Sequence, residues 1–268
     1  MTANSTGVDE RYMVPGLARG LAMLAAFTAE KPQLSLADLA RAVGLTRSSA
    51  FRIAYTLAEL GYLVRDTATK SYRLGPRVLN LGFAFLASME IVEIAHPHLE
   101  ALRDRTQCSA HLAVLDGTEI VYVARHPDQK ALTSRIQVGS RLPAHATSMG
   151  RAMLSQLSPE DVRARFADMP LNAFSQVTAT TIEALVDQLA RDRAQGCVLS
   201  RSNFERGIAS VAAPIFDAGG AVTAAINITT PESTLSGDDL ETRIRDAVIQ
   251  AAATISEWLG HHGERRSA

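Results

Sequence analysis

The N-terminal part of the chain holds three stretches of helical hydrophobic periodicity, separated by short polar breaks. Pro15 opens the first stretch, because the missing N–H of proline is tolerated at the first position of a helix. Ser35 is the expected N-cap of the second, with Asp38 three positions later and Gly44 at its end. Thr46 is the expected N-cap of the third, which runs to about residue 60. Two helices joined by a short turn that contains glycine predict a helix-turn-helix.

The third of these helices has two chemically different faces. Ala50, Ala54 and Leu57 recur on one side and are expected to be buried. A turn of about 100° per residue places Ser48 and Arg52 on the opposite side. Arginine and serine at the start of such a helix are suited to contact base edges and phosphates in the major groove. This face is therefore predicted to bind nucleic acid; a helical hairpin used for protein contact, with solvated arginines, is the alternative.

A basic hairpin follows this helix. Strand-like segments at 62–65 and 72–74 flank a polar turn and predict the wing of a winged helix-turn-helix domain. Residues 1–75 carry nine Lys and Arg against six Asp and Glu, whereas the whole chain has a formal net charge of -1. This distribution fits a local contact with nucleic acid, although solvated surface charge would also explain it. The candidate DNA-contacting residues are Ser35, Thr46, Arg47, Ser48, Ser49, Arg52, Tyr55, Arg65 and Lys70.

The rest of the chain predicts one apolar helix and an α+β domain. A helix beginning at Pro76 is apolar on nearly all sides and needs a partner surface, so we interpret it as a linker that assists dimerisation. Strands are predicted at 109–115, 119–125, 132–138, 197–200, 208–216 and 221–229, and helices at 91–105, 148–156, 181–196 and 238–259, with a further one from Pro159. Paired strands with helices between them indicate an antiparallel sheet.

Catalytic and metal-binding patterns are absent from the sequence. It contains no G-x-S-x-G, H-E-x-x-H, Walker or G-x-G-x-x-G motif, so an enzyme is disfavoured and we expect no cofactor. His96 and His98 lie two positions apart on a helix and face opposite sides, which argues against a metal site. Cys108 and Cys197 have no redox or metal spacing. Since no segment resembles a signal peptide or a membrane span, we expect a cytoplasmic protein.

Several stretches taken together resemble the IclR family of bacterial transcriptional regulators. They are ADLARAVGLTRSSAFRIAYTLAELGYL, YRLGPRVLNLG, LDGTEIVYVAR, VGSRLPAHATSMGRAML, the 196–214 region and AAINITTP, and the similarity covers about residues 12–260. The resemblance implies a winged helix-turn-helix domain at 14–75, a linker helix at 76–90 and a GAF-like effector domain at 91–260. It also implies homodimers that often pair into tetramers.

The stretch VGSRLPAHATSMGRAML is most similar to the subgroup that senses aromatic acids such as protocatechuate and hydroxybenzoate in the β-ketoadipate pathway. The resemblance therefore implies a small carboxylate effector. It implies a pocket lined by Ser148, Met149, Ser200, Ser210, Asn227 and Thr229. The alternative is that Ser148 only caps its helix and that the others are ordinary strand residues.

One segment departs from the pattern of the family. Many relatives have acidic residues where this sequence reads Ser200-Arg201-Ser202, and the change from acid to base favours a more anionic ligand or one with different hydrogen bonding. Arg125 and Arg135 are further candidate partners for a carboxylate.

These features predict a sequence-specific transcriptional regulator that binds double-stranded DNA and is controlled by a small organic acid. The alternative is a metabolite-binding or enzymatic domain whose helical head only oligomerises. That alternative would show no salt-dependent affinity for duplex DNA.

Overall fold

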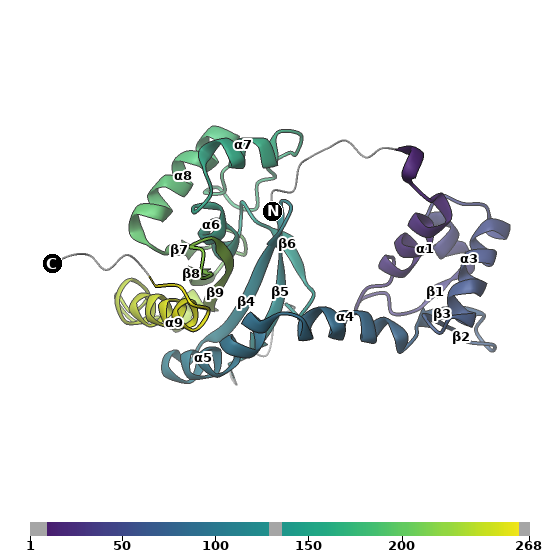
Figure 1. Ribbon diagram of the computed structural model, residues 1–268, viewed down its shortest axis with the longest axis horizontal. Coiled ribbons are helices and arrows are strands. Elements are labelled where there is room, and N and C mark those ends of the chain that lie inside the picture. Colours follow the sequence, from purple (N-terminus) through teal and green to yellow (C-terminus); the bar gives the residue numbers. More distant parts are fainter. Residues whose placement is uncertain (1–9, 129–135, 263–268) are drawn as a thin grey trace. The chain divides into compact units, whose positions relative to one another are not determined.

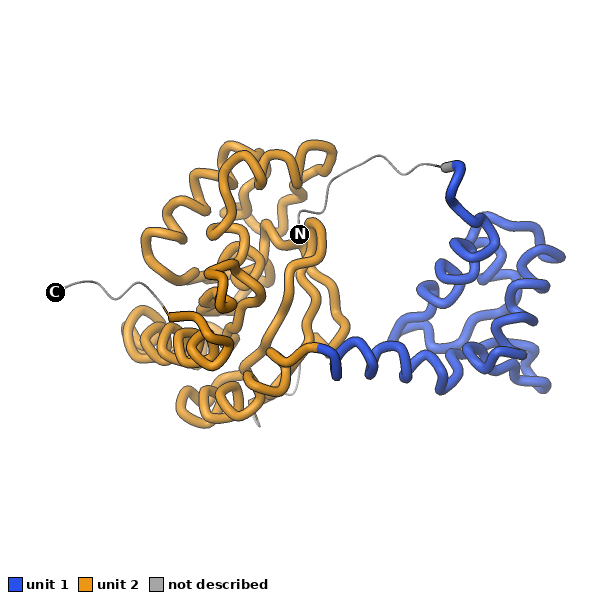
Figure 2. Tube along the Cα trace, viewed as in Figure 1, with its two compact units in different colours: residues 1–88 blue, residues 89–268 orange. Residues whose placement is uncertain are grey.

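The computed structural model describes residues 10–128 and 136–262. The chain divides into two compact units, Met1–Ser88 and Met89–Ala268, coloured separately in Figure 2. Each unit has its own hydrophobic core, and the two are described in turn.

The N-terminal unit packs helices against a small sheet (Figure 1). Its elements are the 3-10 turn η1 (Glu10–Tyr12), α1 (Pro15–Ala25), β1 (Leu34–Ser35), α2 (Leu36–Ala42), α3 (Arg47–Glu59), β2 (Leu63–Arg65), β3 (Ser71–Leu74) and α4 (Arg77–Ala87). The sheet is antiparallel, in the order β1-β3-β2. Met23 of α1, Leu39 of α2, and Ala50 and Ala54 of α3 meet in its core. The predicted helix-turn-helix and wing are both present.

Side-chain caps fix where the two helices of the helix-turn-helix begin. The hydroxyl of Ser35 accepts a hydrogen bond from the Asp38 backbone N–H, and the Asp38 carboxylate accepts one from the Ser35 N–H, which completes a capping box. The hydroxyl of Thr46 accepts from the Ser49 N–H at the start of α3. Both caps are those that the sequence predicts.

Gly75 ties the end of the wing to the turn after α3. Its N–H donates to the carbonyl of Tyr62 at 2.8 Å. A Cβ atom at this position would overlap with the carbonyl oxygen of Gly61. The two segments can approach this closely because residue 75 has no side chain.

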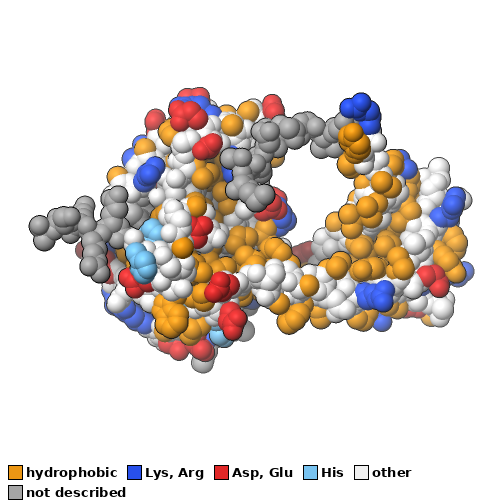
Figure 3. All heavy atoms as spheres, viewed as in Figure 1, with side chains coloured by type: hydrophobic (Ala, Val, Ile, Leu, Met, Phe, Trp, Pro, Cys, Tyr) orange, Lys and Arg blue, Asp and Glu red, His pale blue; other side chains and the backbone are white. Residues whose placement is uncertain are grey.

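Helix α4 has no buried residue. Leu79, Leu81, Phe83 and Phe85 are all at least half exposed. Figure 3 shows hydrophobic side chains gathered along this helix and over α1, where Leu17 is also exposed. The expectation that this helix needs a partner surface agrees with these exposures. No single helix in the described part of the chain is long and apolar enough to cross a membrane; α4 and α5 meet such a test only when taken together across the break between them.

The second unit is built on a six-stranded antiparallel sheet in the order β6-β5-β4-β9-β8-β7. Its elements are α5 (Glu90–Thr106), β4 (Ser109–Asp116), β5 (Glu119–His126), β6 (Arg141–Pro143), α6 (Ser148–Leu154), α7 (Pro159–Phe166), α8 (Ile182–Gln195), β7 (Val198–Arg201), β8 (Ile208–Phe216), β9 (Val222–Pro231), the turns η2 (Glu232–Thr234) and η3 (Leu240–Ile244), and α9 (Arg245–Trp258). Figure 1 shows α5 and α9 on one face of the sheet and α6, α7 and α8 on the other. The α+β class and the antiparallel sheet are as predicted.

Two predicted elements of this unit differ from the structure. The first is the strand predicted at 132–138. Residues 136–138 form no strand, and residues 132–135 lie outside the described residues. The third strand is instead β6, which pairs with β5 in the register Glu119↔Pro143. The C-terminal helix begins with a π-helical turn, η3, in which the Ile244 N–H donates to the Asp239 carbonyl.

Candidate nucleic-acid interface and ligand cavity

The predicted DNA-contacting residues are all exposed to solvent. They are Ser35, Thr46, Arg47, Ser48, Ser49, Arg52, Tyr55, Arg65 and Lys70. On α3, Ser48 and Tyr55 lie opposite the buried Ala50 and Ala54, as the helical period requires. Phe51 is also exposed on this helix, with its ring centroid 6.2 Å from that of Tyr55. Sequence reasoning omitted Phe51 because an apolar residue at a helix start is usually assigned to the core.

Three of these residues have local hydrogen bonds that shape the surface. The Ser35 hydroxyl donates to Asp38 Oδ2 at 2.7 Å, and this bond is the main reason that the pKa of the Asp38 carboxyl lies below its usual value. The Thr46 hydroxyl donates to Ser49 Oγ at 3.1 Å. These serine and threonine side chains therefore hold the starts of α2 and α3, where orphan backbone N–H groups favour phosphate.

The wing is ordered by its own turn. Asp66 accepts hydrogen bonds from the backbone N–H groups of Ala68 and Thr69, at 2.8 and 3.1 Å. The N–H of Thr69 is the main cause of the lowered pKa of Asp66. Lys70 has a left-handed backbone, with φ of 56°, and both Lys70 and Arg65 are exposed. Both cations face solvent. None of the ion pairs found in the described residues involves Arg65 or Lys70.

An apolar groove adjoins α3. Its volume is about 610 Å³, and it is lined by side chains of α1 and α3, by Leu60 and Tyr62 after α3, and by Leu81 of α4. Ser49 and Arg52 also line it. These two residues lie between the exposed face of α3 and the groove, whereas Arg47 and Ser48 do not line the groove.

A small cavity in the second unit gathers most of the predicted effector-binding residues. It measures about 50 Å³ and lies between the sheet, the start of α6 and the segment after β7. Five of the six candidates line it: Ser148, Ser200, Ser210, Asn227 and Thr229. Met149 does not; it is fully buried in the core beside Met153, because a step of one residue on α6 turns the side chain away from Ser148.

A chain of hydrogen bonds crosses the cavity floor. Thr147, not Ser148, caps α6, since its hydroxyl accepts from the Gly150 N–H at 3.3 Å. Ser148 is thereby available to accept from Asn227 Nδ2 at 3.4 Å. Asn227 Oδ1 in turn lies 3.0 Å from His111 Nδ1. The alternative that Ser148 only caps its helix is therefore wrong.

Tyr122, Asn203 and His111 are among the residues at the cavity that the sequence did not predict. Tyr122 and Asn203 line it, and His111 lies beneath it with its ring edge-on to that of Tyr122, at a centroid distance of 5.5 Å. Burial lowers the pKa of His111 to about 4 and raises the pKa of Tyr122. The sequence signal was a polar residue, His111, at an inward position of an otherwise apolar strand.

The arginines considered in the sequence analysis lie in different places relative to the cavity. Arg201 does not line the cavity: its Nη2 lies 2.7 Å from Glu241 Oε1, because β7 alternates and places Ser200 inward and Arg201 outward. The expectation that Arg201 favours a more anionic ligand is therefore wrong for this structure. Arg125 lies directly opposite His111 in the β4–β5 register, with its Nη1 3.3 Å from Gln137 Oε1. Arg135 lies outside the described residues.

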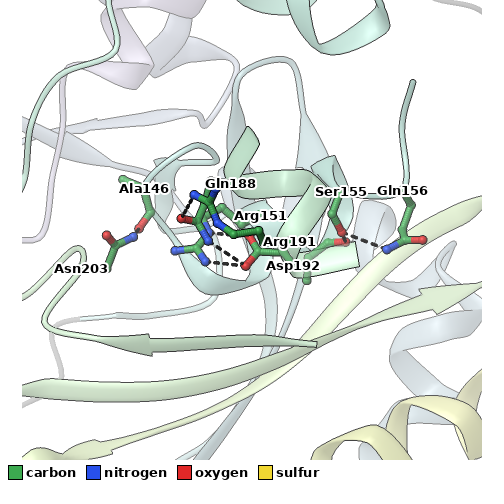
Figure 4. A network of polar contacts seen from close by, with 9 residues as sticks. Ala146, Arg151, Ser155, Gln156, Gln188, Arg191, Asp192 and Asn203 are labelled. Atoms are coloured by element: carbon green, nitrogen blue, oxygen red, sulfur yellow. Dashed lines mark hydrogen bonds and ion pairs between the residues drawn. The ribbon is translucent and has the colours of Figure 1, made fainter. Parts of the chain in front are cut away.

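A buried ion pair fixes α6, which carries Ser148 (Figure 4). Arg151 donates from Nε and Nη2 to the two carboxylate oxygens of Asp192 on α8, at 2.8 and 2.7 Å. Both side chains are less than a tenth exposed. Gln188 adds a third donor to Asp192, at 3.1 Å. Asn203 holds the opposite end of the region, because its Nδ2 donates to the Ala146 carbonyl at 2.9 Å.

No group of three or more His, Cys, Asp or Glu side chains among residues 10–128 and 136–262 is placed to hold a metal ion. The two histidines that flank Pro97 face apart, as predicted. His96 packs against the ring of His126 at 4.6 Å, and His98 lies near Trp258 at 6.3 Å.

A winged helix-turn-helix unit joined to an α+β unit with a polar internal cavity defines a DNA-binding transcriptional regulator with a separate sensory domain. Two family models match the chain: "IclR helix-turn-helix domain" over residues 16–67 and "Bacterial transcriptional regulator IclR C-terminal" over residues 83–257. The chain belongs to the IclR family. It is a regulator and not an enzyme. The relatives, too, are named as regulatory proteins.

Relatives and solved structures agree with this assignment. The chain is 35% identical over 252 residues to the Pca regulon regulatory protein of Pseudomonas putida, covering 94% of this chain and 86% of the relative. It is 34% identical to the p-hydroxybenzoate hydroxylase transcriptional activator of Acinetobacter baylyi, over 80% of each chain. An IclR homologue from Microbacterium hydrocarbonoxydans, solved with 4-hydroxybenzoate, is 27% identical with a TM-score of 0.78, covering 91% of this chain and 98% of that one.

Proposed function

We propose that the N-terminal unit, residues 14–75, reads operator DNA with α3 and contacts phosphates with the wing. The observation that supports this is the exposed polar start of α3, held by the cap of Thr46, with the cations of Arg65 and Lys70 on the adjoining hairpin. Arg47, Ser48 and Arg52 would contact base edges. Ser35, Thr46 and Ser49 would contact phosphates through groups at the helix starts, and Tyr55 would flank them.

The proposed effector of the second unit, residues 91–260, is a small aromatic carboxylic acid. Two relatives are named for aromatic-acid pathways, and one homologous structure holds 4-hydroxybenzoate. The cavity of this chain offers neutral hydrogen-bonding groups on Ser148, Ser200, Ser210, Asn227 and Thr229, which suit a carboxylate. Arg125 pairs with His111 in the β4–β5 register and supplies a positive charge near that residue.

Ligand binding requires this cavity to grow. Its volume of about 50 Å³ is far below the roughly 300 Å³ at which small-molecule pockets usually begin. A ligand would therefore bind an expanded state better than the compact one, and that difference in affinity is what couples an effector to a change of conformation. Asn203 and Phe204, in the segment after β7, line the cavity together with Ser148 and Ser200.

We further propose that the protein is a homodimer, with residues 76–90 as the linker helix, and that dimers pair into tetramers. The exposed apolar face of α4 is a surface for a second copy. A dimer presents two α3 helices to half-sites about 34 Å apart, which a helix-turn-helix needs for specificity. Such a regulator acts in the cytoplasm, where its DNA lies.

A gel-shift titration with the DNA upstream of its own gene tests the DNA-binding assignment. Arg47→Ala should weaken specific binding by about 1–3 kcal/mol, because an arginine contact to a base edge contributes that much. Arg163→Ala removes another exposed cation, from α7, and is the control. Unchanged operator affinity for Arg47→Ala, or a fall of the same size in the control, would refute the assignment.

A thermal-shift series tests the effector assignment. Benzoate-type acids should stabilise the wild-type protein, and Ser148→Leu should abolish that shift because the larger side chain fills the cavity. Met149→Leu is the matched control, since Met149 is buried outside the cavity. If Ser148→Leu retains the full shift, the acid binds elsewhere.

A further inference from the structure

His111 carries a buried ring nitrogen without a hydrogen-bond partner. The side chain is fully buried in the middle of β4. Its Nδ1 lies 3.0 Å from Asn227 Oδ1, whereas its Nε2 has no partner among the residues that the structure describes. Native structures leave few buried polar atoms unsatisfied, and each one needs an explanation.

The neighbouring bonds determine which kind of partner Nε2 lacks. Asn227 donates from its amide nitrogen to Ser148 Oγ, so its carbonyl oxygen is the group that faces His111. A carbonyl oxygen only accepts, and Nδ1 must therefore carry the proton. In the neutral ring the other nitrogen, Nε2, then holds a free lone pair and acts as an acceptor.

The ring stays neutral at physiological pH. Burial is the main reason that the pKa of His111 falls to about 4, and the nearby positive charge of Arg125 lowers it further. Protonation at pH 7 would turn Nε2 into a donor, and the low pKa prevents this. The missing partner is accordingly a hydrogen-bond donor.

The position of His111 connects this nitrogen to the cavity. Its ring is edge-on to Tyr122 and its Nδ1 bonds Asn227, and both of these residues line the cavity, which His111 itself does not. His111 pairs with Asn227 across the strands, whereas Ser210 pairs with Thr229, two residues further along β9. Two residues of a strand span about 7 Å, a distance that a benzene ring with substituents at opposite ends can bridge.

We propose that His111 Nε2 accepts a hydrogen bond from a hydroxyl group of the effector, and that His111 thereby selects hydroxylated aromatic acids over unsubstituted or O-methylated ones. The hydroxyl cluster of Ser200, Ser210 and Thr229 would then receive the carboxylate at the other end of the ring. This inference rests on the proposed function of the cavity as the effector site.

Two substitutions separate the ring nitrogens. His111→Asn keeps a polar group near the position of Nδ1, where it can still bond Asn227, but removes the atom at Nε2. His111→Gln places its amide near the position of Nε2 instead. Calorimetric titration of each full-length variant with 4-hydroxybenzoate, benzoate and 4-methoxybenzoate compares the affinities for a donor, no substituent and an acceptor.

The wild-type protein should bind 4-hydroxybenzoate at least about tenfold more tightly than the other two acids, because a site built to bond a hydroxyl rejects analogues without it. His111→Asn should reduce this preference to less than about threefold and leave the affinity for benzoate nearly unchanged. His111→Gln should retain part of the preference. A wild-type protein that binds 4-methoxybenzoate as tightly, or a His111→Asn variant that keeps the full preference, would overturn the proposal.

If the proposed function itself is wrong, none of the three acids should bind the wild-type protein. That result would also overturn the role of His111. A measurement on the wild-type protein tests the proposal even if the variants fail to fold. Nitrogen NMR of labelled histidine should show an unprotonated Nε2 whose resonance shifts when 4-hydroxybenzoate, but not benzoate, is added. A protonated Nε2 in the free protein would refute the assignment.

Discussion

Removing Asp192 should destabilise the second unit by several kilocalories per mole. The Arg151 guanidinium makes two charge-assisted bonds to this carboxylate, at 2.8 and 2.7 Å, and both side chains are almost completely buried. Asp192→Ala would leave the arginine charge without its partner in a poorly solvated place. Breaking a buried pair in this way costs about 3–5 kcal/mol. For a unit of this size that lowers the melting temperature by roughly 10 °C, at about 2–4 °C per kcal/mol.

Thermal unfolding of the full-length protein, followed by circular dichroism, measures this shift. The matched control is Glu160→Ala, which breaks an exposed pair with Arg163 at 3.9 Å and should change stability by less than about 1 kcal/mol. The double substitution Arg151→Met with Asp192→Leu replaces the pair by apolar groups and should recover most of the loss. These outcomes follow from a desolvated charge and not from a general sensitivity of α8.

Binding of 4-hydroxybenzoate adds a second measurement to the same variants. Because Arg151 holds α6 and α6 carries Ser148, Asp192→Ala should also weaken the binding of the acid at a temperature where the unit remains folded. The reasoning is refuted if Asp192→Ala melts within about 2 °C of the wild type, since the buried-pair cost would then be absent. It is refuted equally if the double variant melts no higher than the single one.

Three further predictions concern other parts of the chain. Gly75→Ala should destabilise the N-terminal unit and weaken DNA binding, because its Cβ would overlap with the carbonyl oxygen of Gly61; a normal melting curve would contradict this. If α4 mediates the proposed dimer, Leu81→Asp should give monomers in light scattering, whereas Glu90→Asp, a mild control near the same helix, should leave the oligomeric state unchanged. The His111 pKa of about 4, against the usual 6.5, means that the unfolded chain binds more protons in this interval, so stability should be complete above pH 6.5 and fall by up to about 3 kcal/mol as the pH approaches 4. His111→Gln should show a flatter profile in urea titrations, and an unchanged slope would exclude His111 as the cause.

Local signals in the sequence predicted the helix boundaries well. The caps at Ser35 and Thr46 and the left-handed glycine at Gly44 are all present, because each depends on bonds within three or four residues. Strands depend on pairing with a distant partner, so local signals did not locate all of them. The third strand lies at 141–143 because β5 pairs there, which the apolar alternation at 132–138 could not reveal.

The cavity shows the same limit. Ser200 and Ser210 come together because β7 and β8 pair in register, and the family resemblance, not the local pattern, placed them there. The change from acid to base at Arg201 predicts a more anionic ligand, but strand alternation turns this side chain toward Glu241. His111 was missed since its importance depends on one bond, to Asn227, that joins residues far apart in the chain. Side chains that act through such long-range contacts cannot be identified from neighbours in sequence.

The exposed apolar side chains of α4 make the stability and operator occupancy of this regulator depend on its own concentration. If its leucines and phenylalanines are covered only by another copy, folding of this segment and self-association are one equilibrium, and the melting temperature rises with protein concentration. Occupancy of a two-part operator then falls more steeply than linearly on dilution, because fewer assembled molecules remain and each separate head binds weakly. A small change in expression would thus produce a disproportionate change in promoter occupancy.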